Sequence, residues 1–155
     1  MERALAKTSE QTLRGHCLCG ASSFELTGPH NWVGHCHCES CRRASASPFT
    51  TWIGHENGRW RWTGQAPQTY ESSPGQTRGF CGTCGSQLYY VSTRYPDETH
   101  FYAALLERPE DATPSQQFHA DEALGWSMMR WIYPRPEPKI NHLVEYDTPS
   151  DILTF

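Results

Sequence analysis

Lysine is nearly absent from the sequence, which contains only Lys7 and Lys139. From residue 97 to the end, eleven acidic residues stand against four basic ones, so the C-terminal third is acidic. A protein that binds nucleic acid broadly needs a basic face, and we therefore expect no nucleic-acid partner. Arginine is more frequent between Cys36 and Cys84, with five against three acidic residues, which suits a region of anionic thiolates.

Long apolar runs and several common motifs are missing as well. No run approaches the ~20 residues of a membrane span, and the first eleven residues are polar, unlike a signal peptide. We therefore expect a cytoplasmic protein with no membrane partner. The sequence has no G-x-G-x-x-G, P-loop, G-x-S-x-G or H-E-x-x-H motif, which argues against dinucleotide, nucleotide, serine-hydrolase and zinc-protease chemistry.

The 155 residues suit one domain, and the 12 glycines and 11 prolines favour short strands and turns over long helices. The fold class we predict is mainly β, with small antiparallel sheets tied by zinc in a single domain. Residues 1–11 are expected to form a flexible tail, residues 12–132 the zinc-binding catalytic domain, and residues 133–155 a Pro-rich connector and C-terminal segment packed on that domain. Strands are predicted at 12–17, 21–27, 32–37, 49–54, 60–63, 68–72, 86–92, 99–106 and 141–146.

Cysteine is the residue that the sequence supplies in an unusual pattern. The seven cysteines fall in three runs, Cys17-Leu18-Cys19-Gly20, Cys36-His37-Cys38-Glu39-Ser40-Cys41 and Cys81-Gly82-Thr83-Cys84-Gly85. An odd number in a reducing compartment fits a disulfide framework poorly. Two outer pairs and a central triplet instead predict one zinc site with four ligands and a second with three.

The outer pairs, Cys17 with Cys19 and Cys81 with Cys84, predict a structural site. Ligands two apart in a strand point to the same face. Ligands three apart and followed by glycine form a tight knuckle whose backbone N–H groups can approach the sulfurs. A redox role for the C-x-x-C pair would need a βαβ context, which the sequence does not show.

The central triplet, Cys36, Cys38 and Cys41, leaves the fourth position of zinc open to water or to a substrate thiolate. We expect Cys36 and Cys38 to share a strand face, with Cys41 one turn further on. Two alternatives stay open: no stable metal, or a site closed by a histidine. His35 and His37 would point to the opposite strand face. The remaining candidates for a closing ligand are His16, His30, His55 and His119.

The arginines that follow the triplet have two interpretations. Arg42 and Arg43 are either a solvated, charge-balancing pair or a clamp for a substrate carboxylate, which guanidinium binds with two hydrogen bonds. Arg42 is the candidate that we carry forward. Trp52 and Trp126 are predicted to lie in the core or in a pocket wall, and His119 in the middle of a strand.

The ordered patterns G-H-C-L-C-G, H-C-H-C-E-S-C-R-R and S-S-P-G-Q-T-R-G-F-C-G-T-C-G-S-Q-L resemble the glutathione-dependent formaldehyde-activating enzyme family. This family shares a domain with a centromere protein. The resemblance runs from about Leu13 to Leu88, and more loosely through Phe118, His119 and Trp126. One departure is that the family commonly has glycine a few residues after C-R-R, where this chain has Ala46 or Ser47.

The resemblance implies a β-tent-like fold and two Zn²⁺ ions per chain. It assigns structural zinc to the outer four cysteines and a more labile catalytic zinc to the triplet, whose cysteines then form the catalytic site. The implied reaction is the reversible addition of glutathione or a similar thiol to formaldehyde, a carbon–sulfur lyase activity. The alternatives are a zinc-stabilised interaction module without catalysis and other chemistry at the three-thiolate zinc. The oligomeric state stays open, a homo-oligomer included.

Overall fold

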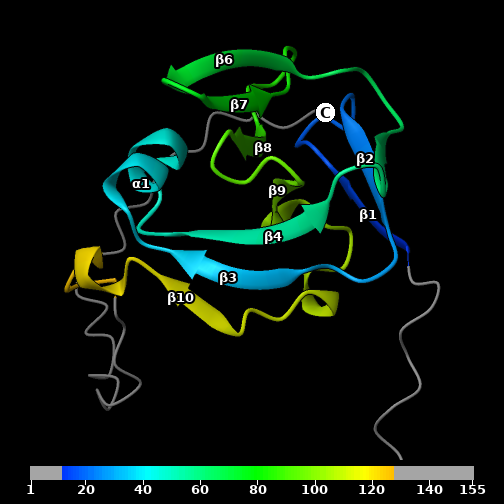
Figure 1. Ribbon diagram of the computed structural model, residues 1–155. Coiled ribbons are helices and arrows are strands. Elements are labelled where there is room, and N and C mark those ends of the chain that lie inside the picture. The colour runs from blue at the N-terminus through cyan, green and yellow to red at the C-terminus, as the bar shows by residue number, and fades with distance from the viewer. Residues whose placement is uncertain (1–11, 128–155) are drawn as a thin grey trace, which may run out of the picture.

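The computed structural model describes residues 12–127. The predicted tail at 1–11, the Pro-rich connector and the strand at 141–146 lie outside the described residues. The strands in the described part of the chain form two sheets (Figure 1). Its strands are β1 (Thr12–His16), β2 (Ser23–Thr27), β3 (Trp32–Cys36), β4 (Thr50–Glu56), β5 (Trp60–Trp62), β6 (Gln68–Ser73), β7 (Gln76–Phe80), β8 (Gln87–Ser92), β9 (Glu98–Tyr102) and β10 (Gln116–Phe118).

The small sheet has the order β1-β2-β5, and the large one has the order β10-β3-β4-β9-β8-β7-β6. Neighbouring strands are antiparallel except β10, which pairs with β3 in parallel. The helices are α1 (Glu39–Ser45) and the 3₁₀ turns η1 (Ala103–Leu105), η2 (Pro109–Asp111) and η3 (Ala120–Glu122). The prediction of a mainly β, single-domain fold is confirmed.

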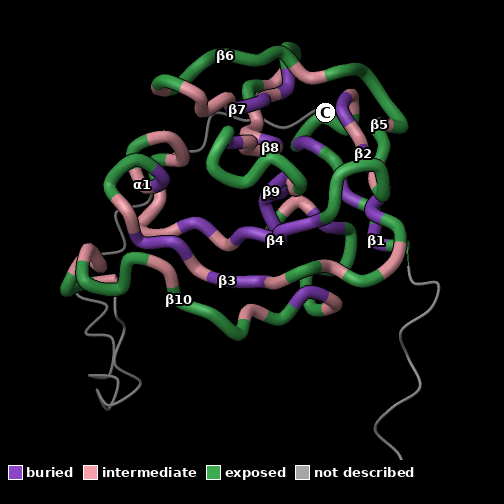
Figure 2. The backbone as a smooth tube through the Cα atoms, in the orientation of Figure 1, coloured by how far each residue is buried: buried purple, intermediate pink, exposed green. Residues whose placement is uncertain are grey.

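The core lies between the two sheets and follows from the two-residue period of the strands. Phe24 and Leu26 of β2 face Ile53 of β4 and Phe101 of β9, and all four side chains are fully buried. The rings of Phe24 and Phe101 stack with centroids 4.9 Å apart. Burying each such side chain contributes ~1.5–3 kcal/mol. Figure 2 shows the buried segments concentrated in the central strands.

The opposite face of the large sheet carries a row of residues that are direct partners across six strands. The row consists of Trp32, Gly54, His100, Tyr90, Arg78 and Tyr70. A second, shorter row joins Gly34, Trp52 and Tyr102. Since cross-strand partners share a face, the sheet presents aromatic and charged side chains on the side away from the core.

Helix α1 and strand β7 are not among the predicted elements, and β10 ends at Phe118, just before the histidine that we expected in the middle of a strand. The helix has only seven residues and buries only Cys41, so its sequence shows no apolar repeat. Strand β7 contains Arg78 and Gly79, residues that are rare in a strand interior, and β10 has three residues. These elements depend on tertiary contacts more than on local pattern.

Ala46 ends helix α1 in the left-handed conformation, with φ 51° and ψ 33°, and its N–H bonds to the carbonyl of Arg42. This is the stretch in which the sequence departs from the family glycine. A left-handed residue other than glycine costs ~1–2 kcal/mol, and glycine is the usual residue after a helix end.

We therefore expect Ala46→Gly to raise the free energy of unfolding by ~0.5–1 kcal/mol, since glycine's own entropy offsets part of the relief. Urea denaturation measures the change. Ala44→Gly, inside the helix, is the matched control and should lower the free energy of unfolding by ~1 kcal/mol. A loss of stability in both variants would contradict the assignment of strain at Ala46.

Among residues 12–127, no helix has the length and apolar character needed to cross a bilayer.

Candidate functional site

The outer cysteine pairs meet at one point. The sulfurs of Cys17, Cys19, Cys81 and Cys84 all lie within 4.8 Å of one another. The Sγ atoms of Cys17 and Cys19 are 3.5 Å apart, and those of Cys19 and Cys81 are 3.8 Å apart. Zinc–sulfur bonds of ~2.3 Å in a tetrahedron place the sulfurs ~3.8 Å apart. The four thiols therefore fit a Zn²⁺ ion.

Two backbone knuckles of the same design present these four sulfurs. In the first, the N–H of Cys17 bonds to the carbonyl of Ser22 and that of Gly20 to the carbonyl of Cys17. In the second, Cys81 bonds to Ser86 and Gly85 to Cys81 in the same way. The glycines share φ 76°, the left-handed region that glycine adopts most easily. The site thus ties the β1–β2 hairpin to the β7–β8 hairpin of the other sheet.

Hydrogen bonds favour the thiolate form at Cys81 and Cys84, whereas at Cys19 the Ala21 backbone lowers the pKa but the neighbouring thiols and burial raise it on balance to about 12. The Ser86 hydroxyl is the main cause that lowers the pKa of Cys84 to about 5. The backbone N–H of Cys84 is the main cause that lowers the pKa of Cys81 to about 7. Cys17 and Cys81 are buried, whereas Cys19 is exposed and Cys84 is half-buried, so the site lies at the edge of the molecule.

The central cysteines also come together. Cys36 is the last residue of β3, Cys38 is the N-cap of α1, and Cys41 lies in the first turn of that helix. The three sulfurs lie within 4.8 Å of one another, with 3.5 Å between those of Cys36 and Cys38. The expectation that Cys36 and Cys38 share a strand face is wrong, because the strand ends at Cys36.

The neighbouring thiols and a backbone N–H favour a charged sulfur at Cys38. The N–H of Cys41 points at the Cys38 sulfur at 3.4 Å. The Cys36 and Cys41 thiols, followed by this N–H, lower the pKa of Cys38. One thiolate with two neighbouring thiols is a donor set suited to Zn²⁺, which deprotonates its thiol ligands.

A cavity of about 370 Å³ opens beside this three-cysteine site, and all three cysteines line it. Aromatic side chains form part of its wall. The rings are those of Trp32, Trp52, Tyr90, Tyr95 and Phe118. Trp52 is buried as expected from the sequence, whereas Trp126 is 71% exposed, so its assignment to the core or a pocket wall is wrong.

Arg78 brings a positive charge to the cavity and is only 2% exposed. Its Nη2 lies 3.2 Å from the Ser40 hydroxyl and 4.0 Å from the Cys41 sulfur. Its guanidinium lies 4.9 Å from the ring centroid of Tyr90. Nε and Nη1 are buried without a partner among the described residues. A buried cation needs a compensating anion, and ionised cysteines at this site would supply one.

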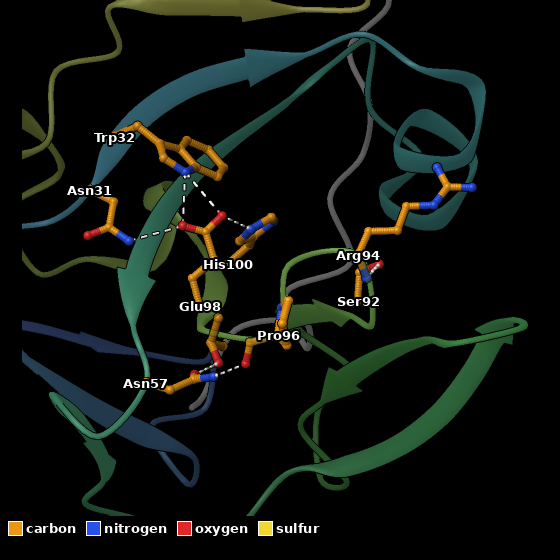
Figure 3. Close-up of polar contacts among 9 residues, drawn as sticks. Asn31, Trp32, Asn57, Ser92, Arg94, Pro96, Glu98 and His100 are labelled. Atoms are coloured by element: carbon orange, nitrogen blue, oxygen red, sulfur yellow. Dashed lines mark hydrogen bonds and ion pairs between the residues drawn. The ribbon is translucent and has the colours of Figure 1, made fainter.

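The side chain of Arg42 lies outside the cavity wall. Its Nε donates to the carbonyl of His37 at 2.9 Å. Arg43 pairs with Glu39 at 2.7 Å on the exposed face of the helix. Arg94 does line the cavity, on the loop after β8, where its N–H bonds to the Ser92 hydroxyl (Figure 3).

The histidines that flank the triplet are engaged away from it. His35 bonds to the Thr51 hydroxyl at 2.9 Å through Nδ1, and His37 bonds to the Gln117 side chain at 2.7 Å through Nε2. His55 is buried and bonds to the carbonyls of Thr27 and Arg59.

Of the candidate closing histidines, His119 lines the cavity. It follows β10 with φ 54° and pairs with Glu122 at 3.1 Å through Nδ1, so its placement within a strand is wrong. Within residues 12–127, no histidine, aspartate or glutamate joins the three-sulfur group.

Four cavity residues with charged or imidazole side chains were not singled out by the sequence reasoning. They are Arg78, Arg94, Glu98 and His100. The alternation Glu98-x-His100-x-Tyr102 is the signal that could have indicated two of them, because it places these side chains on one face of a strand.

Comparison with known proteins agrees with this architecture. The profile of the family described as "Glutathione-dependent formaldehyde-activating enzyme" matches residues 12–122. The chain belongs to this family. A Halomonas elongata protein, provisionally named as an enzyme of the same description, is 29% identical over 105 residues, covering 61% of this chain and 66% of that protein. This is just under two thirds of the Halomonas protein's length.

Two further relatives extend the comparison. An uncharacterized lyase of Schizosaccharomyces pombe is 29% identical over 108 residues, covering 70% of this chain and 78% of the yeast protein. A crystal structure of a Rhodobacter sphaeroides protein superposes with a TM-score of 0.51 at 23% identity, covering 61% of this chain and 87% of that one. The latter similarity shows that the fold occurs in a solved structure.

Proposed function

We propose that this family member is a zinc-dependent carbon–sulfur lyase that adds glutathione, or a thiol like it, reversibly to formaldehyde. Its relatives named as a formaldehyde-activating enzyme and as a lyase support the reaction class. The observation that carries the proposal is a group of three cysteine sulfurs on the wall of a cavity, with no fourth side-chain ligand among the described residues.

Cys36, Cys38 and Cys41 would hold the catalytic Zn²⁺. When bound, the ion supplies Lewis acidity and favours the thiolate form of a thiol beside it. The protein's own residues compensate charge and position the reactants. Arg78, 4.0 Å from the Cys41 sulfur, offsets the negative charge that gathers at this end of the cavity. The aromatic side chains of the wall would hold the reactants close together.

The outer cysteines would hold the structural Zn²⁺. Their knuckles join the two sheets, and Cys17 and Cys81 are almost wholly buried, at 0% and 1% exposure. This ion would be released only on unfolding, whereas the ion at the cavity would be the more labile one. All seven cysteines are free, which suits the reducing conditions of the cytoplasm, where we place the protein.

Glutathione carries two carboxylates, and Arg94 is the cavity arginine best placed to bind one. It is exposed and has no acidic partner among the described residues. We expect Arg94→Gln to weaken glutathione binding about tenfold, or ~1.4 kcal/mol, as for a charged hydrogen bond near solvent. Binding of 2-mercaptoethanol, a neutral thiol, should not change. Isothermal titration calorimetry of the zinc-loaded protein measures both.

Arg42→Gln is the matched control for this clamp. Because the Arg42 side chain is bonded to the His37 carbonyl outside the cavity, it should leave the ratio of the two affinities unchanged. Selective loss of glutathione binding in Arg42→Gln, or equal losses for both thiols in Arg94→Gln, would overturn the choice of Arg94.

The reaction itself is tested by NMR magnetisation transfer between glutathione and S-hydroxymethylglutathione, because the uncatalysed addition also proceeds. Zinc-loaded protein at micromolar concentration should raise the exchange rate in proportion to its concentration. An exchange rate equal to that of buffer alone, with thiol nevertheless bound at the cavity, would contradict the lyase and favour a binding module.

A further inference from the structure

Glu98 and His100 form a hydrogen-bonded pair on the wall of the cavity. Both lie on β9 with one residue between them, so their side chains share the cavity face of the sheet. The Nε2 atom of His100 and the Oε1 atom of Glu98 are 2.8 Å apart (Figure 3). His100 is 8% exposed. The mechanism outlined above uses neither residue.

Two further donors fix the carboxylate of Glu98. Asn31 Nδ2 donates to Oε2 at 3.0 Å, and Trp32 Nε1 lies 3.2 Å from both oxygens. The indole reaches β9 because Gly54 stands between Trp32 and His100 in the cross-strand register. A Cβ atom at Gly54 would clash with the Trp32 indole. The pair is therefore held in one orientation before any substrate arrives.

These contacts set the protonation states of the pair. Burial lowers the pKa of His100, and Glu98 opposes this shift only in part. Burial alone would raise the pKa of Glu98, but the hydrogen bonds from Asn31, His100 and Trp32 lower it on balance. Near neutral pH, a carboxylate thus accepts the Nε2–H of a neutral imidazole. The lone pair on Nδ1 is then free to take a proton.

His100 lines the cavity, and no described residue forms a hydrogen bond with its Nδ1. This atom is not among the buried, unpartnered ring nitrogens of the described residues, which include Nδ1 of His37 and Nδ1 of His55. The rings around His100 are those of Trp32, Tyr90, Tyr95 and Trp52, with centroids 4.8, 5.5, 5.7 and 6.4 Å away. The other charged or titratable groups that line the cavity with Glu98 are Arg78, Arg94, His119, Tyr90, Tyr95 and the three cysteines.

Trp52 connects the imidazole to the candidate reaction centre. Trp52 packs in one cluster with Cys36 and Cys41 and contacts His100 as well. A substrate whose thiol lies at the three-cysteine site and whose other atoms extend along the cavity would meet Nδ1, directly or through one water.

We propose that His100 is the catalytic residue that carries the proton in this reaction, and that Glu98 is the positioning residue that fixes its tautomer and orientation. The proposal rests on the lyase function proposed above. In the forward direction, Nδ1 takes, directly or through one water, the proton that the thiol loses as it ionises, and the sulfur pair then attacks the aldehyde carbon. The C=O π pair moves to oxygen, and Nδ1–H returns the proton to that oxygen. The bonds S–C and O–H form, S–H and the C=O π bond break, and no redox partner is needed.

An architectural role for the pair makes a different prediction. Such a network would orient Trp32 and the cavity wall, and its loss would lower stability and binding without changing how the rate depends on pH. A proton carrier gives the rate an acid limb, because protonated His100 cannot accept the thiol proton. The rate should fall as the pH drops through the pKa of His100.

The test is the pH profile of the exchange rate for zinc-loaded wild type and two variants. His100→Gln should lower the rate by about 10²-fold, the lower end for acid–base catalysis, and abolish the acid limb. Glu98→Gln should move the acid limb to lower pH, since the carboxylate that raises the pKa of His100 is gone. His55→Gln is the matched control, a buried histidine outside the cavity, and should lower stability without moving the limb. The proposal would be overturned if the acid limb of the pH profile persists in His100→Gln, or if it keeps its wild-type pH position in Glu98→Gln.

A measurement on the wild-type protein tests the proposal even if the variants fail to fold. The ¹⁵N NMR spectrum of histidine-labelled, zinc-loaded protein should show His100 as the Nε2–H tautomer at neutral pH, and glutathione should shift its Nδ1 resonance. Glutathione that binds at the three-cysteine site but leaves His100 unshifted would refute the proton carrier alone. Glutathione that does not bind at all would refute the lyase, and the proton carrier with it.

Discussion

Cys81→Ser is expected to abolish the folded state, or to lower the free energy of unfolding by more than ~5 kcal/mol. Structural zinc binds with apparent free energies of ~10–16 kcal/mol, and that energy is folding energy. A domain of this size has only ~5–15 kcal/mol of net stability. Cys81 is 1% exposed, so the replacement hydroxyl is buried as well, and the tie between the two sheets is lost.

Zinc content, far-UV circular dichroism and urea denaturation together measure this effect. Ser86→Ala is the matched control at the same knuckle, because the Ser86 hydroxyl accepts from the N–H of Leu18 at 3.0 Å and contacts the Cys84 sulfur at 3.2 Å, yet is not a metal ligand. It should cost only ~1 kcal/mol. A stable Cys81→Ser protein that still contains the tightly held zinc would contradict the structural assignment.

In contrast to Cys81→Ser, Cys38→Ser is expected to leave the fold intact and to abolish the function. Cys38 is the N-cap of α1, and serine is a preferred N-cap whose hydroxyl can accept the bond from the Cys41 N–H. We therefore expect a stability within ~1 kcal/mol of wild type. Zinc should fall from two ions per chain to one, and both thiol binding and catalysed exchange should disappear.

Arg43→Gln is the control for this variant, since Arg43 lies on the same helix, pairs with Glu39 in solvent and does not line the cavity. It should retain two zinc ions and full exchange activity. If Cys38→Ser unfolds instead, the three-cysteine site is structural, and the catalytic interpretation is wrong.

The strand pattern and the division of the cysteines could be predicted from the sequence. Both depend on local rules, the two-residue period of strands and the short spacing of metal ligands. The helix between Cys38 and Ala46 could not, because seven mostly exposed residues carry no apolar repeat. The turn at Cys38 is set by the helix N-terminus, whereas the spacing alone suggested a continued strand.

The position of the Arg42 side chain could not be predicted from the sequence for a similar reason. Arg42 follows the cysteines in sequence, but its side chain direction is set by the phase of a helix that the sequence did not reveal. Both Arg78 and Arg94 lie far from Arg42 in the sequence; Arg78 reaches the cavity through the pairing of β7 with β8, and Arg94 from the loop after β8. The Glu98–His100 pair was missed because the predicted strand began at residue 99, and because Trp32 meets Glu98 only through the order of strands β3, β4 and β9.

The most direct test of the account is the visible spectrum of the cobalt-substituted protein during titration with glutathione. Cobalt in both sites should show sulfur-to-metal charge-transfer bands for seven cysteine thiolates. The account predicts that glutathione adds a further thiolate band, that the added intensity saturates at one thiol per chain, and that Cys38→Ser abolishes it. A spectrum that glutathione leaves unchanged, with both sites filled, would show that the three-cysteine site has no position for a thiol and would contradict the proposed lyase.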